Sequence, residues 1–491
     1  MAGSEEGVGQ ARSYSVPDVL VLLLALALVT FAATWLFAPG VYDYLPGTDR
    51  IDPASYRALS EAQGAPWFGS AERTGLIDFL YNGLVSGGRD SGVVALGAFI
   101  LIIGGVFGII MHTGAIDRGL AALTSKAESP TDLMIPALFV VFSLCGAVFG
   151  MAEETIALTL VLAPVLIRAG YDGITALLVC YCGSQVGFAT SWMNPFNVII
   201  AQSVAGVPAM SGIGVRLAMW VLFTTLSAAY VWRYARRVRL GPTHSLVYGN
   251  HGDIDEFAPI SENQPRFGIG DALIVATLLA GIIWVGWGVA TQGFYFAEMG
   301  GQFLAIGLAT AIIARIFGLN KLDAGKLAEA FRNGAAQMVP VILIVAAAKG
   351  IVLLMGGDDP TVPSLLNAIL NGLSSITLLL PEWLTTFGML IVQSCINFFI
   401  PSGSGQAAVT MPLLAPLGDI SGVTRQVTVL AFQLGDGLAN LIVPTSAALM
   451  GCLAAARVNF GTWLAFIWRP LIALYLVATA FLLAAQAAGF S

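Results

Sequence analysis

The sequence predicts an all-α polytopic membrane protein built from two inverted repeats, each with a re-entrant hairpin and a broken transmembrane helix. Three observations predict this fold class. Hydrophobic residues make up 57% of the 491 residues and charged residues only 10%, whereas soluble domains carry about 25% charged residues. Apolar runs long enough to cross a bilayer recur along the chain. Two of these runs, one in each half, share a pattern of Gly, Pro and polar residues.

The first half of the chain is predicted to contain four segments. Residues 1–18 are mostly polar and are expected to be disordered, and residues 19–39 form the first transmembrane helix. Residues 40–90 carry many acidic side chains and are expected to form an extracytoplasmic loop. Residues 91–239 form the first inverted repeat, which ends in the basic run RYARRVR.

The second half is predicted to contain three segments. Residues 240–268 form a polar cytoplasmic linker, residues 269–335 form linking transmembrane helices, and residues 336–491 form the second inverted repeat. Arginine and lysine concentrate at the end of the first repeat and again between linking helices, and such clusters mark the cytoplasmic side of a membrane. This rule places the loop 40–90 on the extracytoplasmic side of the membrane.

The two repeats are matched by Gly, Pro and polar positions at a single offset of 252 residues. The charge rule places the starts of the two units on opposite sides of the membrane, so the repeats have opposite orientation. A chance alignment of two unrelated apolar runs is the alternative. The matched positions are Ala163-Pro164 with Ala415-Pro416, Gly170 with Gly422, Gly183 with Gly435, and Gly150–Thr155 with Ser402–Ala407.

Interruptions inside these apolar runs predict a binding site. The segments near Pro401–Gly405 and Gly435–Ser446 contain Gly, Pro and polar residues that a continuous membrane helix avoids. Backbone that is not helical at membrane depth is tolerated only where protein buries it or where it lines a watery cavity. Inverted repeats with matched broken segments are typical of transporters that alternate access around a site at the membrane midplane.

The candidate substrate- and ion-binding residues lie at the two hairpin tips and in the two broken helices. Hydroxyl and amide oxygens there are hard ligands that suit sodium, and amides also suit a substrate carboxylate. For each serine the alternative is a local cap or backbone hydrogen bond. The candidates are Glu153, Glu154, Thr155, Ser184, Gln185, Asn194, Pro195, Asn197, Ser402, Gly403, Ser404, Gly405, Gln406, Asp436, Asn440, Thr445 and Ser446, of which Ser402, Ser404, Asn194 and Thr445 are the candidate ligands for Na+.

Carboxylates inside a membrane are costly and tend to be functional. Glu153 and Glu154 lie at the first predicted tip and Asp436 in the second broken helix. Such a group is expected to hold the ammonium or guanidinium of a cationic substrate, or to take up a coupling proton. The alternative is that one glutamate caps a helix N-terminus. The site stretches offer only Arg425 as a cation, which favours a cationic or zwitterionic substrate over a dicarboxylate.

Other classes of function find less support. The net charge of −7 and the absence of a basic stripe argue against nucleic acid as a partner. The run SGSGQ lacks the lysine of a phosphate-binding loop, and no clustered nucleophile, base or metal set predicts an enzyme. We expect no cofactor other than Na+ or H+ as a coupling ion. An ion channel or a membrane-embedded enzyme is the alternative of another class.

Three long runs resemble a known family. They are NPFNVIIAQSVAGVPAMSGIGVRL, FFIPSGSGQAAVTMPLLAPLGD and RQVTVLAFQLGDGLANLIVPTSAALMG, and they resemble the YfcC type of the four-carbon dicarboxylate anaerobic carrier family, in the ion transporter superfamily. The resemblance implies a multi-pass secondary carrier of the bacterial inner membrane, with two re-entrant hairpins, two broken helices and a homodimeric state.

The resemblance leaves the substrate open, because relatives are assigned dicarboxylates or basic amino acids exchanged as in arginine/ornithine antiport. We expect a secondary active transporter that moves basic amino acids such as arginine and ornithine by ion coupling or exchange. A sodium- or proton-coupled carrier of C4-dicarboxylates is the alternative within the same class.

Overall fold

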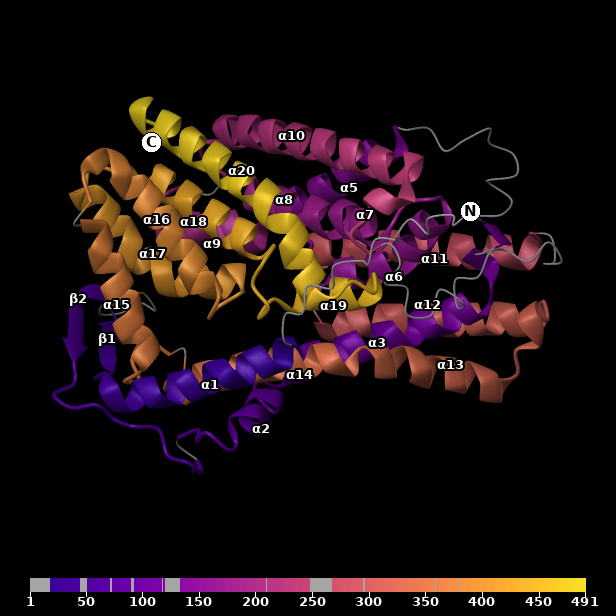
Figure 1. Cartoon of the computed structure of the whole chain (residues 1–491), viewed down its shortest axis with the longest axis horizontal. Coiled ribbons are helices and arrows are strands. Elements are labelled where there is room, and N and C mark those ends of the chain that lie inside the picture. The colour runs from indigo at the N-terminus through magenta and orange to yellow at the C-terminus, as the bar shows by residue number, and fades with distance from the viewer. Residues whose placement is uncertain are drawn as a thin grey trace, which may run out of the picture.

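The computed structural model is mostly helical, with one two-stranded β-hairpin (Figure 1). It describes residues 18–44, 51–70, 73–89, 92–116, 118–119, 133–208, 210–247, 267–294, 296–357, 359–378 and 380–491. The predictions of a disordered N-terminus over residues 1–18 and of a linker over residues 240–268 fall for the most part outside these described residues.

The N-terminal segment begins with a membrane-length helix. Helix α1 spans Val19–Leu36 and starts at Asp18, whose side chain accepts a hydrogen bond from the Leu20 N–H at 2.8 Å. The antiparallel strands β1 (Gly40–Tyr44) and β2 (Ile51–Ala58) follow within the region predicted as a loop. Loop 40–90 therefore contains a sheet, and helix α2 (Phe79–Leu84) follows it.

Small residues allow α3 (Gly92–His112) to pack closely against α13 (Ala324–Gln337). A Cβ atom on Gly104 would lie 2.7 Å from the Gly334 carbonyl oxygen, and the backbones approach still more closely at Gly108. Such small-residue contacts are common between membrane helices. Helix α13 continues almost directly into α14 (Val339–Leu354), which packs against α1 and α2.

Six helical stretches within the described residues are long and apolar enough to cross a membrane. Because a bilayer core needs about 20 apolar residues of helix, these stretches support a multi-pass arrangement. They are Val19–Leu36, Gly92–His112, Ile213–Leu240, Phe296–Ile316, Ala324–Leu354 and Phe460–Ala487. Helix α11 (Ile269–Trp287) is a shorter apolar helix that precedes α12 (Phe296–Ile316).

Two groups of helices repeat the same order along the chain. The first group is α5 (Met134–Phe149), α6 (Glu154–Arg168), α7 (Gly173–Leu177) joined through the π-helical η1 (Leu178–Cys182) to α8 (Gly183–Ala189), then η2 (Pro195–Ile199) with α9 (Ile200–Val204), and α10 (Ile213–Leu240). The second group follows α15 (Leu365–Leu378) and is α16 (Glu382–Asn397), α17 (Gly403–Ile420), α18 (Arg425–Ala439), α19 (Ala447–Ala455) and α20 (Phe460–Ala487).

The last helix of each group gives the relative orientation of the two groups. Gly212, just before α10, lies beside the ring of Phe490, just after α20. Farther along α10, the ring of Tyr234 packs on that of Phe466 near the start of α20, with centroids 4.8 Å apart. The two helices are therefore antiparallel and lie side by side (Figure 1). The predicted fold class of two inverted repeats is confirmed.

The repeats are packed into one another rather than side by side. Helix α6 of the first repeat contacts α19 of the second, α17 of the second contacts α9 of the first, and α8 contacts α18. Each half of the broken helices is thus covered by the other repeat. The two breaks, residues 190–194 and 440–446, are mostly buried by this interlocking, whereas the two tips, residues 150–153 and 398–402, are only partly buried.

Candidate functional site

Four interruptions meet between the repeats. Residues 150–153 separate α5 from α6, and residues 398–402 separate α16 from α17, which forms the two helix–turn–helix tips. Residues 190–194 and 440–446 interrupt the two broken helices. The second break was expected from Gly435 onward, but α18 continues in helical form to Ala439.

Glycines bring the tips against the broken helices. Gly150 has a φ of +72°, and a Cβ atom there would collide with the side chain of Asn194 at the first break. A Cβ atom on Gly403 would lie 3.0 Å from both the Asp436 carboxylate and the Phe196 carbonyl oxygen. The second tip therefore lies between the two broken helices, where a side chain larger than that of glycine would be tightly packed.

Asp436 lies at the centre of the site and is fully buried, with 0% exposure. Its Oδ2 accepts a hydrogen bond from the Asn197 side-chain amide and its Oδ1 one from the Asn397 amide, each at 2.7 Å. Asp436 and Asn397 come from α18 and α16 of the second repeat, and Asn197 comes from η2 of the first repeat. Within the described residues no basic side chain pairs with this carboxylate.

The two asparagines leave acceptor atoms free around that carboxylate. Asn197 Oδ1 and Asn397 Oδ1 are both buried and without a hydrogen-bond partner. A buried polar atom without a partner costs free energy. Two amide oxygens beside a carboxylate are a set of hard ligands, which suits a small cation or a donor-rich organic cation.

A ladder of amides holds the second helix–turn–helix together behind Asp436. The Asn397 amide also lies 3.1 Å from Gln406 Oε1, and the Gln406 amide donates to Gln393 Oε1 at 2.7 Å. The Gln393 amide in turn donates to Thr410 Oγ1 at 3.0 Å. Of these residues only Gln406 was predicted. Asn397, Gln393 and Thr410 were missed, although uncharged polar residues within an apolar span are a detectable signal.

The second break is held by side chains that the sequence did not single out. The Tyr181 hydroxyl donates to the Asn440 carbonyl oxygen at 2.7 Å, and the Trp463 indole N–H donates to the Leu441 carbonyl oxygen at 2.8 Å. The Asn440 side-chain amide faces Gln185 Oε1 at 3.4 Å. These donors satisfy carbonyls that the interruption of the helix leaves without partners.

Several predicted polar residues also act as local caps. Asn194 Oδ1 accepts from the Phe196 N–H at 2.8 Å, and Ser402 and Ser446 accept from N–H groups three residues farther along. Thr445 donates to the Phe398 carbonyl oxygen at 2.8 Å and so ties the second break to the second tip. The alternative of local caps therefore applies to Asn194, Ser402 and Ser446, whose oxygens each retain a further lone pair.

The two glutamates lie half-buried at the first tip. Glu154 Oε2 accepts from the Ala152 N–H at 3.0 Å, so this side chain closes the turn. Glu153 occupies the residue before α6, and its side chain makes no capping hydrogen bond. Of the two acids, Glu153 is the one that is not used to hold the tip.

Thr155 and Ser184 fasten the first tip to its neighbours. The Thr155 hydroxyl bonds to the Ala152 carbonyl oxygen and lies 3.3 Å from Cys452 Sγ on α19. The Ser184 hydroxyl donates to the Met151 carbonyl oxygen. These contacts give both residues a structural role at the tip.

The four candidate sodium ligands do not all lie at the same tip. Ser402 and Thr445 belong to the second tip, Ser404 is half-buried one residue beyond Gly403, and Asn194 is held beside Gly150 at the first tip. The remaining candidates are backbone positions: Pro195 opens η2, and Gly405 donates its N–H to Ser402. Arg425 forms an exposed ion pair with Asp419 at 2.9 Å, away from these tips.

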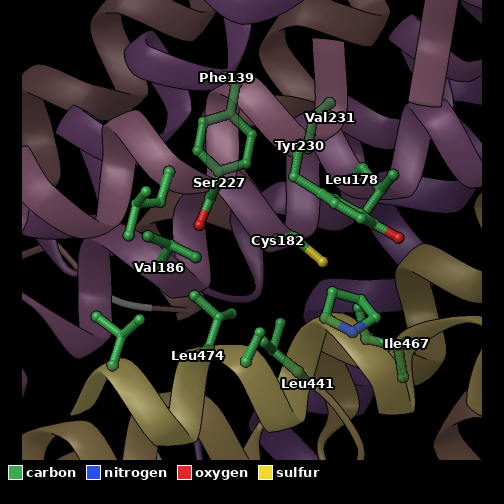
Figure 2. Close-up of a pocket in the computed structure, with 14 residues that line it drawn as sticks. Phe139, Leu178, Cys182, Val186, Ser227, Tyr230, Val231, Leu441, Ile467 and Leu474 are labelled. Carbon is green, nitrogen blue, oxygen red and sulfur yellow. The ribbon is translucent and has the colours of Figure 1, made fainter. Parts of the chain in front are cut away.

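An apolar cavity lies beside this polar centre and is separate from it. It has a volume of about 270 Å³ and lies between α5, η1, α10 and α20, with Phe139, Cys182, Tyr230 and Leu474 among its lining residues. Figure 2 shows these side chains around the open space. None of the candidate site residues lines this cavity. It therefore has the character of a lateral gap between membrane helices.

Inverted repeats with interrupted helices around a buried carboxylate define a secondary transporter. Comparison with known proteins identifies the family of transporters to which the chain belongs. The family model of the C4-dicarboxylate anaerobic carriers, DcuC, matches residues 16–487, and the chain belongs to that family. It is thus a multi-pass protein of the inner membrane that moves a small molecule.

Two curated relatives match along their whole length. One is a protein of Escherichia coli strain K12 with the name "Putative basic amino acid antiporter YfcC", which is 42% identical over 98% of both chains. The other is an uncharacterized protein of Haemophilus influenzae, which is 27% identical over 98% of both chains.

Two solved transporter structures also align with the chain. They are the YdaH transporter of Alcanivorax borkumensis, at 16% identity and a TM-score of 0.43, and the MtrF efflux pump of Neisseria gonorrhoeae, at 17% identity and a TM-score of 0.40. The alignments cover 96% of this chain in both cases, and 99% and 95% of the other chains.

Proposed function

We propose that this transporter moves basic amino acids such as arginine and ornithine, by exchange or by ion coupling, and that Asp436 receives their cationic group. The observation that carries the proposal is the environment of Asp436. It is fully buried and accepts two hydrogen bonds from neutral amides, and no basic side chain within the described residues pairs with it.

The energetics of a buried carboxylate favour a cation as its missing partner. Removing such a group from water costs several kcal/mol even after relaxation, and two neutral hydrogen bonds offset only part of this cost. The free oxygens of Asn197 and Asn397 can accept further hydrogen bonds. An ammonium or guanidinium offers both a charge and several N–H donors, so it satisfies the carboxylate and the two amides together.

The name of the Escherichia coli relative supports this choice of substrate. The description of the family supports a second candidate, a C4-dicarboxylate carrier. In that case the same oxygens would bind Na+ or a proton, and the coupling ion would neutralise Asp436 before an anionic substrate enters. Homodimer formation and the identity of the coupling ion remain predictions from the family resemblance.

The test is uptake of labelled arginine, ornithine and succinate into proteoliposomes, with and without unlabelled substrate inside. Sodium and pH gradients are varied separately. We expect arginine uptake that internal ornithine accelerates, and we expect Asp436→Asn to abolish it. Asp419→Asn is the matched control, because Asp419 lies in an exposed ion pair at the end of α17. Sodium-driven succinate uptake without arginine uptake would refute the proposal.

A further inference from the structure

A second buried charge contacts the helix that carries Asp436, and it was not among the residues predicted for the site. Arg216 on α10 is fully buried, with 0% exposure. Its Nε donates to Gln433 Oε1 at 3.1 Å, its Nη1 donates to the Ser211 carbonyl oxygen at 2.8 Å, and its guanidinium carbon lies 5.7 Å from the centre of the Phe490 ring. Its Nη2 is buried and has no partner.

This guanidinium lacks an anion. Within the described residues no Asp or Glu pairs with Arg216, and all of its recorded partners are neutral. A buried cation is as costly as a buried carboxylate unless it is paired. The planar fork of arginine favours a carboxylate, which accepts two parallel N–H bonds. The unused Nη2 is therefore a donor without its natural acceptor.

Gln433 connects Arg216 to the site. Its Oε1 accepts from Arg216, while its amide donates to the carbonyl oxygens of Ala189 and Ser191 at the first break, at 3.2 and 3.0 Å. Gln433 and Asp436 are three residues apart on α18, which places them on one side of the helix and about 4.5 Å apart along its axis. The unpaired cation on α10 thus contacts α18 at Gln433, one turn before the unpaired carboxylate of Asp436 on that helix.

We infer that Arg216 binds the α-carboxylate of the substrate, while Asp436 binds its cationic group. The inference rests on the proposed function and adds a requirement to it. A substrate must carry a carboxylate as well as a cation, so a basic amino acid fits and the amine left by its decarboxylation does not. Only such a molecule supplies both charges that the site lacks.

The test compares arginine with agmatine, which has the same guanidinium but no carboxylate. Competition against labelled arginine uptake is measured in proteoliposomes for the wild type, for Arg216→Gln and Arg216→Lys, and for Arg425→Gln. Arg425 is the control, because it is an exposed arginine at the start of α18 that pairs with Asp419. In the wild type we expect arginine to compete at least about tenfold better than agmatine, as loss of one charged hydrogen-bond pair predicts.

We expect Arg216→Gln to bring this ratio close to one, Arg216→Lys to give an intermediate ratio, and Arg425→Gln to keep the wild-type ratio. An unchanged ratio in both Arg216 variants overturns the inference. If the variants do not fold, thermal protection of the wild type decides, and equal protection by agmatine and arginine overturns the inference. A wild-type protein that transports succinate but not arginine instead refutes the proposed function.

Discussion

Replacing Asp436 by asparagine or by alanine separates its charge from its hydrogen bonds. Both substitutions remove the negative charge, but only asparagine keeps side-chain atoms that can bond to Asn197 and Asn397. One of these two asparagines must turn its amide when Asp436→Asn is made. Its free Oδ1 then accepts from the new amide, because both Oδ1 atoms lack a partner in the wild type.

The magnitude follows from the two bonds of 2.7 Å. In Asp436→Ala one N–H of each asparagine amide loses its acceptor, although the Asn397 amide keeps its bond to Gln406 Oε1. Each buried N–H without a partner costs about 1–3 kcal/mol. We therefore expect Asp436→Ala to be less stable than Asp436→Asn by roughly 2–6 kcal/mol. The desolvation cost of the charge is relieved equally in both variants, so it cancels in this comparison. Relative to the wild type, Asp436→Asn is expected to be at least as stable.

The assay pairs thermal unfolding in detergent with arginine uptake in proteoliposomes. We expect the melting temperature to be highest for Asp436→Asn, lower for the wild type and lowest for Asp436→Ala. We expect uptake only in the wild type. Equal melting temperatures for the two variants would show that the asparagines do not depend on an oxygen at this position. Uptake at the wild-type rate by Asp436→Asn would refute the argument that the charge binds the substrate.

Three further predictions concern the supports of the site and one ion pair in the surrounding helices. Gly403→Ala is expected to lower uptake more than Gly405→Ala, because the added Cβ would lie 3.0 Å from the central carboxylate at position 403 and 3.3 Å from its nearest neighbour, Ser402, at position 405; equal uptake by the two variants would contradict this. Asp271→Asn should lower the free energy of unfolding by about 3–5 kcal/mol, because Asp271 pairs at 2.7 Å with Arg118 and both are nearly fully buried; a melting temperature within one degree of the wild type would contradict this. Tyr181→Phe leaves a buried carbonyl at the second break without its donor and should cost about 1–3 kcal/mol, measured as a fall in melting temperature with uptake still detectable; unchanged melting would show that another group replaces the hydroxyl.

The interruptions were predictable because they depend on local effects: polar residues that cap the helix directly after them, and glycines that form the turns. The offset of 252 residues connects Asn194 with Ser446, and each of these caps the second half of a broken helix. It also connects Gly170 with Gly422, which both have a positive φ, of 90° and 72°. Glycine adopts this conformation without strain, so its position in the sequence marks the turn.

The partners around the interruptions could not be predicted in the same way. Asn397 and Tyr181 are single polar residues in apolar helices, and their roles come from atoms 39 and 259 residues away. Arg425 was the only cation considered for the site from the sequence, and Arg216, which contacts Gln433 on the second broken helix, was not singled out. Arg425 pairs with Asp419 at the surface, whereas Arg216 is buried near the broken helices. Local sequence does not distinguish an arginine that turns inward from one that reaches the membrane surface.

The interlocking of the repeats has a consequence for the synthesis of the protein. Asn197 and its acceptor Asp436 are separated by 239 residues. At about 5–20 residues per second, the ribosome needs about 10–50 s to make the second after the first. During that time the first repeat is in the membrane without α17 and α19, which later cover α9 and α6. Exposed amides and carbonyls in a bilayer are costly, so the nascent first half must be held by insertion factors or remain partly outside the lipid until the second half arrives.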